Sequence, residues 1–298
     1  FFAAMSAPTF AQEAEEKAED VENIIVTGTR MSNRSAADSP VPVDVITGEE
    51  FRQNSSSDVQ DMLRTNVPSF DVNTQPISDA ATIVRPANMR GLSPDNVLVL
   101  VNGKRRHRGS IISFLGGGIS DGAQGVDISA IPSLALKQVE VLRDGASSQY
   151  GSDAIAGVLN FLLRDDDEGF EFRANYGSTY EGDGDNYTIS ANAGFSLGAD
   201  GFVNITGDIR DVEGTVRSVV RNDVQGMVDA GYLTQADFST INTYTNEVPQ
   251  YWGQPDVEDD YKVFINSAYE LNEKAELYLF GNYGKRTVTG GFFYRNPV

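Results

Sequence analysis

Three evenly spaced glycines raise the first chemical question in this sequence: Gly145, Gly151 and Gly157. They follow an apolar alternation, as phosphate-binding glycines follow a strand. However, the dinucleotide and mononucleotide loops need G-x-G-x-x-G or G-x-x-x-x-G-K-[ST], and neither is present. Acidic residues flank the turn, whereas bound phosphate favours positive charge. The stretch therefore predicts a strand, a tight turn, a short helical turn capped by Ser152 or Asp153, and a strand over 157–163.

Residues that catalysis or metal binding would use are sparse. His107 is the only histidine, so a multi-histidine metal site is excluded and a Ser–His–Asp triad would depend on this residue alone. It lies in a basic run, KRRHR, where a solvated side chain is the simpler explanation. Carboxylates cluster at 181–186 and 255–260, but neither stretch has calcium-loop spacing, so solvated loops are expected. We predict no catalytic residue, metal site or cofactor, and therefore no enzyme.

Composition narrows the class of protein. The 298 residues include 23 lysines and arginines against 43 aspartates and glutamates, a net charge of -20. A nucleic-acid-binding protein normally has the opposite sign, so no nucleic-acid partner is predicted. Cysteine is absent, which excludes disulfides and thiolate chemistry.

The N-terminal region predicts export. Residues 1–11 are apolar and end in small residues, as the tail of a secretory signal peptide does. Residues 12–40 are polar and lack periodicity except for the island NIIVTGTR, so a flexible extended segment is expected there. No apolar run approaches the ~18 residues of a membrane helix, so a membrane location would require strands.

Residues 41–164 predict a compact mixed α+β unit. The segments VPVDVIT and NVLVLV have the composition of strands, and Asn102–Gly103 after the second is a strong hairpin signal. Two capping boxes predict helix starts: Thr47 with Glu50, and Ser57 with Gln60. The second helix is expected to end before Pro68.

Residues 165–298 predict strands of about ten residues, each with an apolar and a polar face. Short turns alternate with long polar connections, the longest over about 212–260, with a helix expected within 222–238. This pattern fits strands of a membrane barrel whose apolar side faces outward. A soluble antiparallel sandwich has the same period of two and is the alternative.

Several segments together resemble the TonB-dependent outer-membrane receptors. ENIIVTGTR (22–30) is similar to the TonB box of that family. The matching residues are Ile24, Ile25, Val26, Thr27 and Gly28. VPVDVIT, IVRPANMRGLSPDNVLVLVNGKR and IPSLALKQVEVLRDGASSQYGSDAIAGVLNFLLR resemble successive blocks of the plug, which is assigned to 41–164. Asn102 stands where the family usually has aspartate, a substitution that a turn accepts.

The resemblance implies an α+β plug followed by the first antiparallel strands of a transmembrane β-barrel. The barrel is incomplete within 165–298, because the family's barrels have about 22 strands. Glycines would let the plug backbone turn tightly and approach the surrounding wall, and arginines would reach carboxylates, often on the barrel. The residues with this structural role are Arg90, Gly91, Asn102, Gly103, Arg143, Gly145, Gly151 and Gly157.

The resemblance also implies a function, which is ligand-gated uptake of a scarce nutrient across the outer membrane of a Gram-negative cell. TonB, a periplasmic energy transducer, would pair with residues 24–28 as an added strand. The other partners would be outer-membrane lipid and an extracellular small molecule such as a siderophore, cobalamin or a saccharide. The alternative function is a soluble periplasmic or surface ligand-binding module with a β-sandwich C-terminal half.

By the same resemblance, the glycine-rich loop 104–125 would point toward the extracellular side. Its ligand-facing candidates are Arg105, Arg106, His107, Arg108 and Phe114. The basic side chains would attract an anionic ligand, and the aromatic ring would stack on it. The alternative is that these cations pair with carboxylates of the barrel wall.

Overall fold

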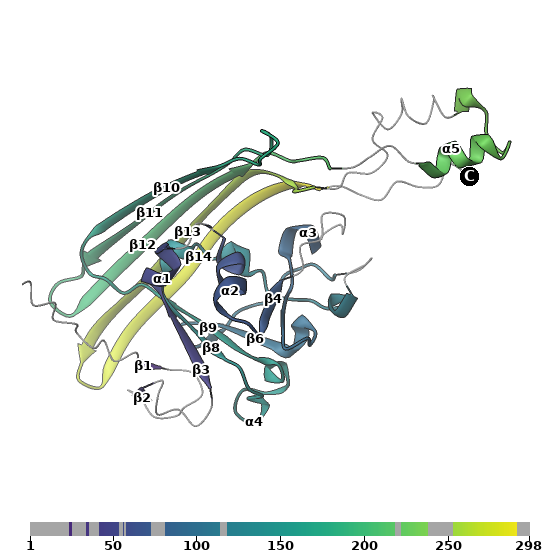
Figure 1. Cartoon of the computed structure of the whole chain (residues 1–298). Helices are drawn as coiled ribbons and strands as arrows, with labels where there is room; N and C mark the ends of the chain where they lie inside the picture. The colour runs from purple at the N-terminus through teal and green to yellow at the C-terminus, as the bar shows by residue number, and fades with distance from the viewer. Residues whose placement is uncertain are drawn as a thin grey trace, which may run out of the picture.

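A curved antiparallel sheet covers one side of a smaller mixed unit in the computed structural model (Figure 1). The residues described are 24–25, 34–35, 42–53, 56, 58–72, 81–113, 118–217, 222–237 and 253–290. The predicted signal-peptide remnant, Val26, Thr27, Gly28 and Phe114 lie outside them. We call the mixed unit over 42–164 the plug and the curved sheet the wall.

The plug is built on a five-stranded sheet in the order β3-β8-β9-β6-β7. Its strands are β3 (Val43–Thr47), β6 (Val97–Val101), β7 (Lys104–Arg105), β8 (Leu136–Leu142) and β9 (Gly157–Leu163). Strands β6 and β9 are parallel, and the other neighbours are antiparallel. A separate hairpin pairs β4 (Phe70–Val72) with β5 (Ala87–Met89). The sheet therefore has the mixed character that the sequence predicts.

Short helices and 3₁₀ turns complete the plug. The helices are α1 (Gly48–Gln53), α2 (Val59–Asn66), α3 (Ala81–Val84) and α4 (Ser147–Tyr150). The 3₁₀ turns are η2 (Pro94–Asn96), η3 (Gly118–Ser120), η4 (Ile128–Ala130), η5 (Ser133–Ala135) and η6 (Ser152–Ala154). The core lies where the apolar sides of α1 and α2 meet the sheet, with Phe51, Met62 and Phe161 fully buried. The wall adds Phe264 to this core, so the two parts share apolar packing.

Helix starts in the plug follow two different capping arrangements. The box between Thr47 and Glu50 is confirmed, because the Thr47 N–H donates to the Glu50 carboxylate at 2.6 Å and the Glu50 N–H donates back to Oγ1 at 3.3 Å. Ser57 of the second predicted box lies outside the described residues, and the helix cap falls one residue later than predicted. Asp58 is the N-cap of α2, and its carboxylate accepts from the Gln60 N–H at 2.9 Å. A carboxylate there satisfies helix donors and adds charge near the positive end of the helix.

The glycine stretch forms the predicted strand, turn and strand, but its helical part differs. Helix α4 begins at Ser147 without a side-chain cap, and η6 follows after Gly151, whose φ is 95°. The predicted cap at Ser152 or Asp153 is therefore wrong. Gly157 has φ 150°, and a Cβ there would lie 2.5 Å from the Leu142 carbonyl oxygen. The close neighbours of Gly157 thus belong to the plug itself, rather than to the wall as expected.

Replacing Gly157 with alanine is expected to destabilise β9 by roughly 2–4 kcal/mol, because the new Cβ would meet backbone and the φ is unfavourable for L side chains. Gly145→Ala is the matched control, since a Cβ there lies 3.3 Å from the Ile155 carbonyl oxygen and needs only a small adjustment. Native-state hydrogen exchange of β9 amides measures the difference. Equal exchange in the two variants would contradict the prediction.

The wall contains five strands in chain order, each antiparallel to the next. They are β10 (Phe170–Gly177), β11 (Asn186–Ser196), β12 (Gly201–Val212), β13 (Asp256–Asn272) and β14 (Ala275–Thr289). Phe170 and Tyr176 are each 72% exposed, whereas Asn192 and Thr206 are 2% and 1% exposed against the plug. A soluble sandwich would bury the apolar face instead. That alternative is wrong, and the predicted plug followed by barrel strands is confirmed.

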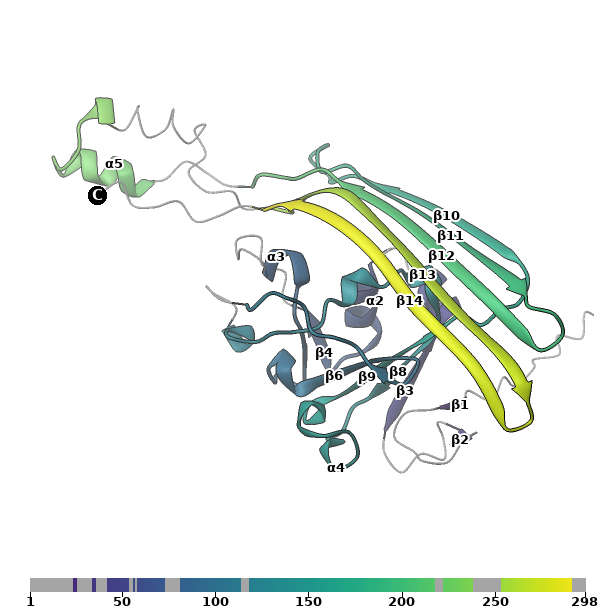
Figure 2. The same ribbon diagram turned by 180° about the vertical axis from the view of Figure 1, so that it is seen from behind.

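The two ends of the wall differ as predicted. Short turns join β11 to β12 and β13 to β14 at one end, and β1 (Ile24–Ile25) and β2 (Arg34–Ser35) lie near that end in both views (Figures 1 and 2). The long connection between β12 and β13 leaves from the other end and carries α5 (Asn222–Asp229), away from the plug (Figure 2). Among the described residues, no helix combines the length and apolar character needed to cross a membrane.

Candidate functional site

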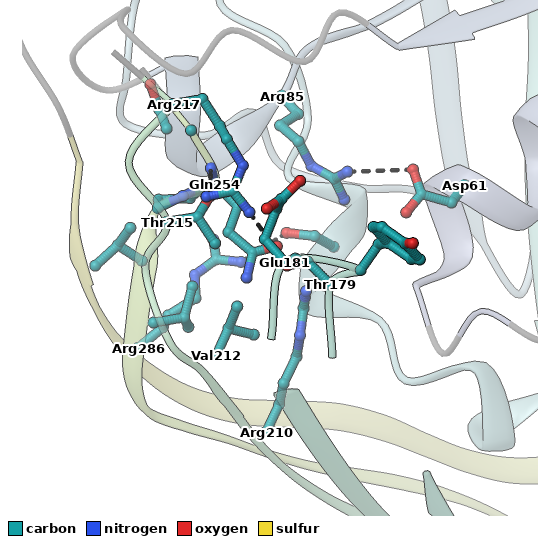
Figure 3. Close-up of a pocket in the computed structure, with 17 residues that line it drawn as sticks. Asp61, Arg85, Thr179, Glu181, Arg210, Val212, Thr215, Arg217, Gln254 and Arg286 are labelled. Atoms are coloured by element: carbon teal, nitrogen blue, oxygen red, sulfur yellow. Dashed lines mark hydrogen bonds and ion pairs between the residues drawn. The ribbon is translucent and has the colours of Figure 1, made fainter. Parts of the chain in front are cut away.

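A pocket of about 790 Å³ lies between the plug and the long-connection end of the wall (Figure 3). The plug contributes Asp61, Thr82, Arg85 and Ser129. The wall and its connections contribute Thr179, Tyr180, Glu181, Arg210, Val212, Thr215, Arg217, Gly253, Gln254, Pro255, Val257, Arg286 and Val288. This volume is typical of small-molecule sites. Four of the lining side chains are arginines and two are carboxylates, so the lining carries an excess of positive charge.

Two of the arginines share one buried plug carboxylate. Arg85 is ion-paired with Asp58, and Arg210 of β12 lies 3.4 Å from the same carboxylate. Burial alone would raise the pKa of Asp58, but Arg85 and Arg210 outweigh it and lower the value from 3.8 to about 2. Burial and the neighbouring Asp58 charge raise the pKa of Asp61, which lies 3.4 Å from Arg85. Asp58 is therefore ionised at neutral pH and ties the plug to the wall.

Arg85 is held in an unusual backbone conformation beside this carboxylate. Its φ is 46°, which costs free energy in a residue with a side chain. The Gln60 side-chain amide donates to the Arg85 carbonyl at 2.8 Å, which helps to fix the turn. The conformation directs the guanidinium toward α2 and the pocket (Figure 3).

A second group of polar contacts joins the plug to the wall, at β14. Arg286 donates to the Asp127 carboxylate at 2.8 Å and to the Ser129 hydroxyl at 2.7 Å. Its side chain is 17% exposed and lines the pocket. The wall arginines Arg210 and Arg286 thus have two roles, because each contacts a plug carboxylate and borders the pocket.

The fourth arginine that lines the pocket lies in the long connection between β12 and β13. Arg217 follows β12 and makes two 2.6 Å hydrogen bonds to Asp183, and it also donates to the Thr179 hydroxyl at 3.1 Å. These contacts join the connection after β10 to the connection after β12. They place the Arg217 guanidinium at the upper rim of the pocket (Figure 3).

The inner face of the wall carries a further charged cluster below the pocket. Lys262 lies 3.3 Å from Asp208 and 3.4 Å from Asp260, and all three side chains are buried. The Ser190 hydroxyl donates to Asp208 at 2.7 Å. Buried charges persist only when paired, so this face must be covered by protein or water rather than lipid.

The first acidic cluster lies mainly in an exposed connection, as predicted, whereas residues 256–260 of the second form the start of β13. Asp183 of the first cluster is engaged by Arg217, and Asp260 of the second is buried in β13 against Lys262. Within the described parts of the chain, no three His, Cys, Asp or Glu side chains group closely enough to hold a metal.

The basic run 104–108, which the sequence analysis considered as ligand-facing, has partners within the plug. Arg105 is ion-paired with Asp153, and Arg108 lies 3.6 Å from Asp95. Pairing was one of the two expected alternatives, but these carboxylates belong to the plug and not to the wall. His107 is exposed.

Lys104 and Arg106 of the run contact β14 of the wall. Lys104 lies 5.5 Å from the ring centroid of Tyr278, and Arg106 donates to the Asn282 side chain at 2.6 Å. Tyr278 is close to the short turn that begins β14. Lys104 therefore lies toward the short turns, and the orientation expected for the loop 104–125 stays a prediction. The basic run does not border the pocket.

The two predicted structural arginines lie side by side. Arg90 donates to the Arg143 carbonyl at 3.0 Å and lies 3.6 Å from Asp144, and Arg143 lies 2.7 Å from Asp44. These partners are plug carboxylates, in contrast to the expected barrel carboxylates. Arg90 and Gly91 both have positive φ, 54° and 69°, so the predicted turn requires glycine at its second position.

The predicted hairpin turn joins the plug to the wall. Asn102 and Gly103 have φ 47° and 71°, as a two-residue hairpin turn requires. The Asn102 amide donates to Asn266 of β13 at 3.1 Å, and its oxygen accepts from the Leu163 N–H at 2.9 Å. An aspartate side chain has no N–H to donate to Asn266, so this hydrogen bond explains why asparagine suits position 102.

Sequence reasoning missed the residues that form the pocket. The period-two alternation placed Arg210 on the polar face of its strand, which was the one available signal. Asp58, Arg85 and Asp127 come from separate plug segments and carry no local pattern. Only the packing of the plug against the wall brings them to Arg210 and Arg286.

The fold is a curved wall that holds a plug against its polar face. Residues 35–158 match the family model of the TonB-dependent Receptor Plug Domain. This match shows that the chain contains a plug domain of that family.

Solved receptors have the same fold. A mutant of the ferric enterobactin receptor PfeA from Pseudomonas aeruginosa, in complex with enterobactin, is 19% identical with a TM-score of 0.60, over 83% of this chain and 33% of the receptor. The siderophore receptor PirA from Acinetobacter baumannii is 20% identical with a TM-score of 0.58, over 83% and 32%. The outer-membrane receptor FpvA from P. aeruginosa, bound to pyoverdine, is 13% identical with a TM-score of 0.57, over 93% and 32%. The chain spans about one third of the length of these receptors.

Proposed function

We propose that this receptor takes up an extracellular small molecule across the outer membrane of a Gram-negative cell, energised by TonB. The observation that carries the proposal is the plug packed against the polar face of a wall whose apolar face is exposed. Such a wall suits a lipid environment, with the plug inside it. PfeA and FpvA are bound to enterobactin and pyoverdine, which supports a siderophore among the candidate ligands.

The two ends of the wall support a direction for this uptake. The ligand enters at the end with the long connections, where the pocket lies. TonB binds at the other end, where β1 lies near the short turns (Figure 1). It adds a strand to residues 24–28, pulls on the plug and opens a path for the ligand.

The full-length receptor is expected to fractionate with the outer membrane and to require detergent for extraction. In water, the receptor would expose the aromatic and aliphatic side chains on the outer face of the wall to solvent, which is unfavourable. Sucrose-gradient fractionation, with a soluble periplasmic protein as the reference, makes the measurement. Recovery of an intact, soluble monomer from the periplasm would contradict the proposed location and the uptake that depends on it.

A further inference from the structure

Arg210 has two acidic neighbours, one on the plug and one on the wall. Its guanidinium lies 3.4 Å from the Asp58 carboxylate of the plug. In the register of the wall, Arg210 of β12 stands directly opposite Asp260 of β13. Side chains directly opposite each other in an antiparallel pair project from the same face, with their Cβ atoms about 5 Å apart. The Asp260 carboxylate therefore lies within reach of the same guanidinium.

The contacts of Asp260 leave it able to accept a second cation. The residue is 1% exposed, and within the described part of the chain its Oδ2 atom accepts no hydrogen bond. It lies 3.4 Å from Lys262, and Lys262 also lies 3.3 Å from Asp208. One lysine thus serves two buried carboxylates. A carboxylate has about four lone-pair sites, so Asp260 retains acceptor capacity on the side of Arg210.

A β-bulge in β13 lies beside this carboxylate. The register of β13 shifts against both of its neighbouring strands at this point. Asp259 has φ 52°, a conformation that costs free energy in a residue with a side chain. Its own carboxylate pairs with Lys285 at 3.0 Å. Bulges commonly re-aim a side chain, so the strand accepts local strain next to the carboxylate that faces Arg210.

The charges on the two surfaces balance separately when Arg210 is counted with the wall. The buried patch of the wall then has two cations and two carboxylates, namely Arg210, Lys262, Asp208 and Asp260. On the plug, Asp58 keeps its ion pair with Arg85. A buried charge left without a partner strongly disfavours the state that contains it. Separation of plug and wall avoids that state if Arg210 pairs with Asp260.

We propose that Arg210 exchanges partners when the plug moves, from Asp58 of the seated plug to Asp260 of the wall. The exchange keeps the guanidinium paired in both states, so displacement of α2 leaves no buried cation alone. This inference deepens the proposed uptake, in which the plug is pulled, and it rests on that proposal for its purpose. The exchange itself needs neither ligand nor TonB.

Substitutions of the two carboxylates are expected to act on α2 in opposite directions. Asp58→Asn removes the partner of the seated state and is expected to speed hydrogen exchange of the α2 amides roughly tenfold to a hundredfold. Asp260→Asn removes the partner of the displaced state, so Arg210 depends on Asp58, and α2 exchange is expected to slow roughly tenfold. A purely structural role of Asp260 predicts the opposite sign, because loss of its pair with Lys262 would weaken the wall behind the plug.

Two further variants separate charge from local structure. Asp259→Asn is the matched control, because it changes the neighbouring bulge residue, whose side chain is 60% exposed. Its α2 amides are expected to exchange at the wild-type rate. In Asp208→Asn, Lys262 has Asp260 as its remaining partner and competes with Arg210 for it. This variant is expected to slow α2 exchange as well.

Native-state hydrogen exchange of the full-length receptor in detergent, without ligand or TonB, measures these rates. Exchange of the β13 amides reports whether the wall is intact, and if Asp260→Asn speeds it, the Asp208→Asn variant decides. In an Arg210→Gln background, Asp260→Asn is expected to leave α2 exchange unchanged. The expected order of rates in a receptor that takes up no labelled ferric siderophore would contradict siderophore uptake and leave the exchange of partners intact.

Three results would overturn the inference. The first is α2 exchange at or above the wild-type rate in the deciding variant, Asp260→Asn or Asp208→Asn. The second is equal slowing in Asp259→Asn and Asp260→Asn, which would assign the effect to the bulge rather than to the charge. The third is slowing by Asp260→Asn that persists in the Arg210→Gln background, because the effect would then not pass through Arg210.

Discussion

Replacing Ile25 with proline is expected to abolish accumulation of the ligand while leaving its binding unchanged. Under the proposed function, TonB pairs with residues 24–28 as an added strand, and such pairing depends on main-chain donors. Proline removes one N–H and fixes φ near about -65°. Ile25 itself pairs with Arg34 in the short sheet of β1 and β2, and the structure places this sheet near the short-turn end of the wall. The pocket is at the other end, so the affinity for the ligand should not change.

The measurement for Ile25→Pro is paired. Binding of a labelled ferric siderophore is measured on whole cells, and its accumulation is measured in energised cells. Ile25→Ala is the matched control, because it removes side-chain contacts but retains the N–H. Accumulation at the wild-type rate in Ile25→Pro cells would exclude Ile25 from the docking strand. Loss of binding together with uptake would assign the segment to the structure of the plug.

Replacing Asp58 is expected to produce the largest loss of plug stability. Asp58→Asn keeps a side chain that caps α2 well but leaves Arg85 and Arg210 without their shared counter-charge. A pKa lowered from 3.8 to about 2 corresponds to roughly 2 kcal/mol, at about 1.4 kcal/mol for each pKa unit. Asp58→Ala also removes the cap, and the total loss is expected to be about 3–5 kcal/mol.

Native-state hydrogen exchange of the α2 amides measures this loss in the full-length receptor. Asp144→Asn is the control, because its carboxylate is 63% exposed and only 3.6 Å from Arg90. A surface pair of that kind contributes about 0–1 kcal/mol. Exchange of α2 at the wild-type rate in Asp58→Asn would contradict the structural role of this carboxylate.

The contribution of Asp58 also predicts a dependence on pH. Its pKa is lower in the folded state, so its stabilisation is complete above the unfolded value of 3.8 and is lost as pH falls toward about 2. Asp61 acts in the opposite direction, because its pKa is raised in the folded state. The difference between wild type and Asp58→Asn isolates the first effect. This difference should shrink between pH 4 and pH 2, values that follow from the same two pKa values.

Local patterns in the sequence determined the elements of this protein and the class of its fold. The period-two alternation in the second half assigned one face of each strand to apolar surroundings, because successive side chains in a strand point to opposite sides. The Asn102–Gly103 pair predicted its hairpin turn, since few residues adopt positive φ at both positions. The box between Thr47 and Glu50 predicted the start of α1, because both hydrogen bonds lie within one turn of chain.

Tertiary structure decided which side of the alternation packs against the plug and which residues form the pocket. The alternation alone fits a soluble sandwich as well as a barrel wall, and only the position of the plug against the polar face distinguishes them. Likewise, the basic run 104–108 is the most evident anion-binding pattern in the sequence, but its arginines find partners in the plug and on the wall.

The pocket arginines differ from the basic run, because the only local signal for them is the position of Arg210 on the polar face of its strand. Arg210 and Arg286 are distant in the chain from Asp58 and Asp127, and they meet only because the wall curves around the plug. The physical reason is that a charge becomes part of a site through its neighbours and its burial. Both of these arise from long-range packing, which a single sequence specifies but does not display.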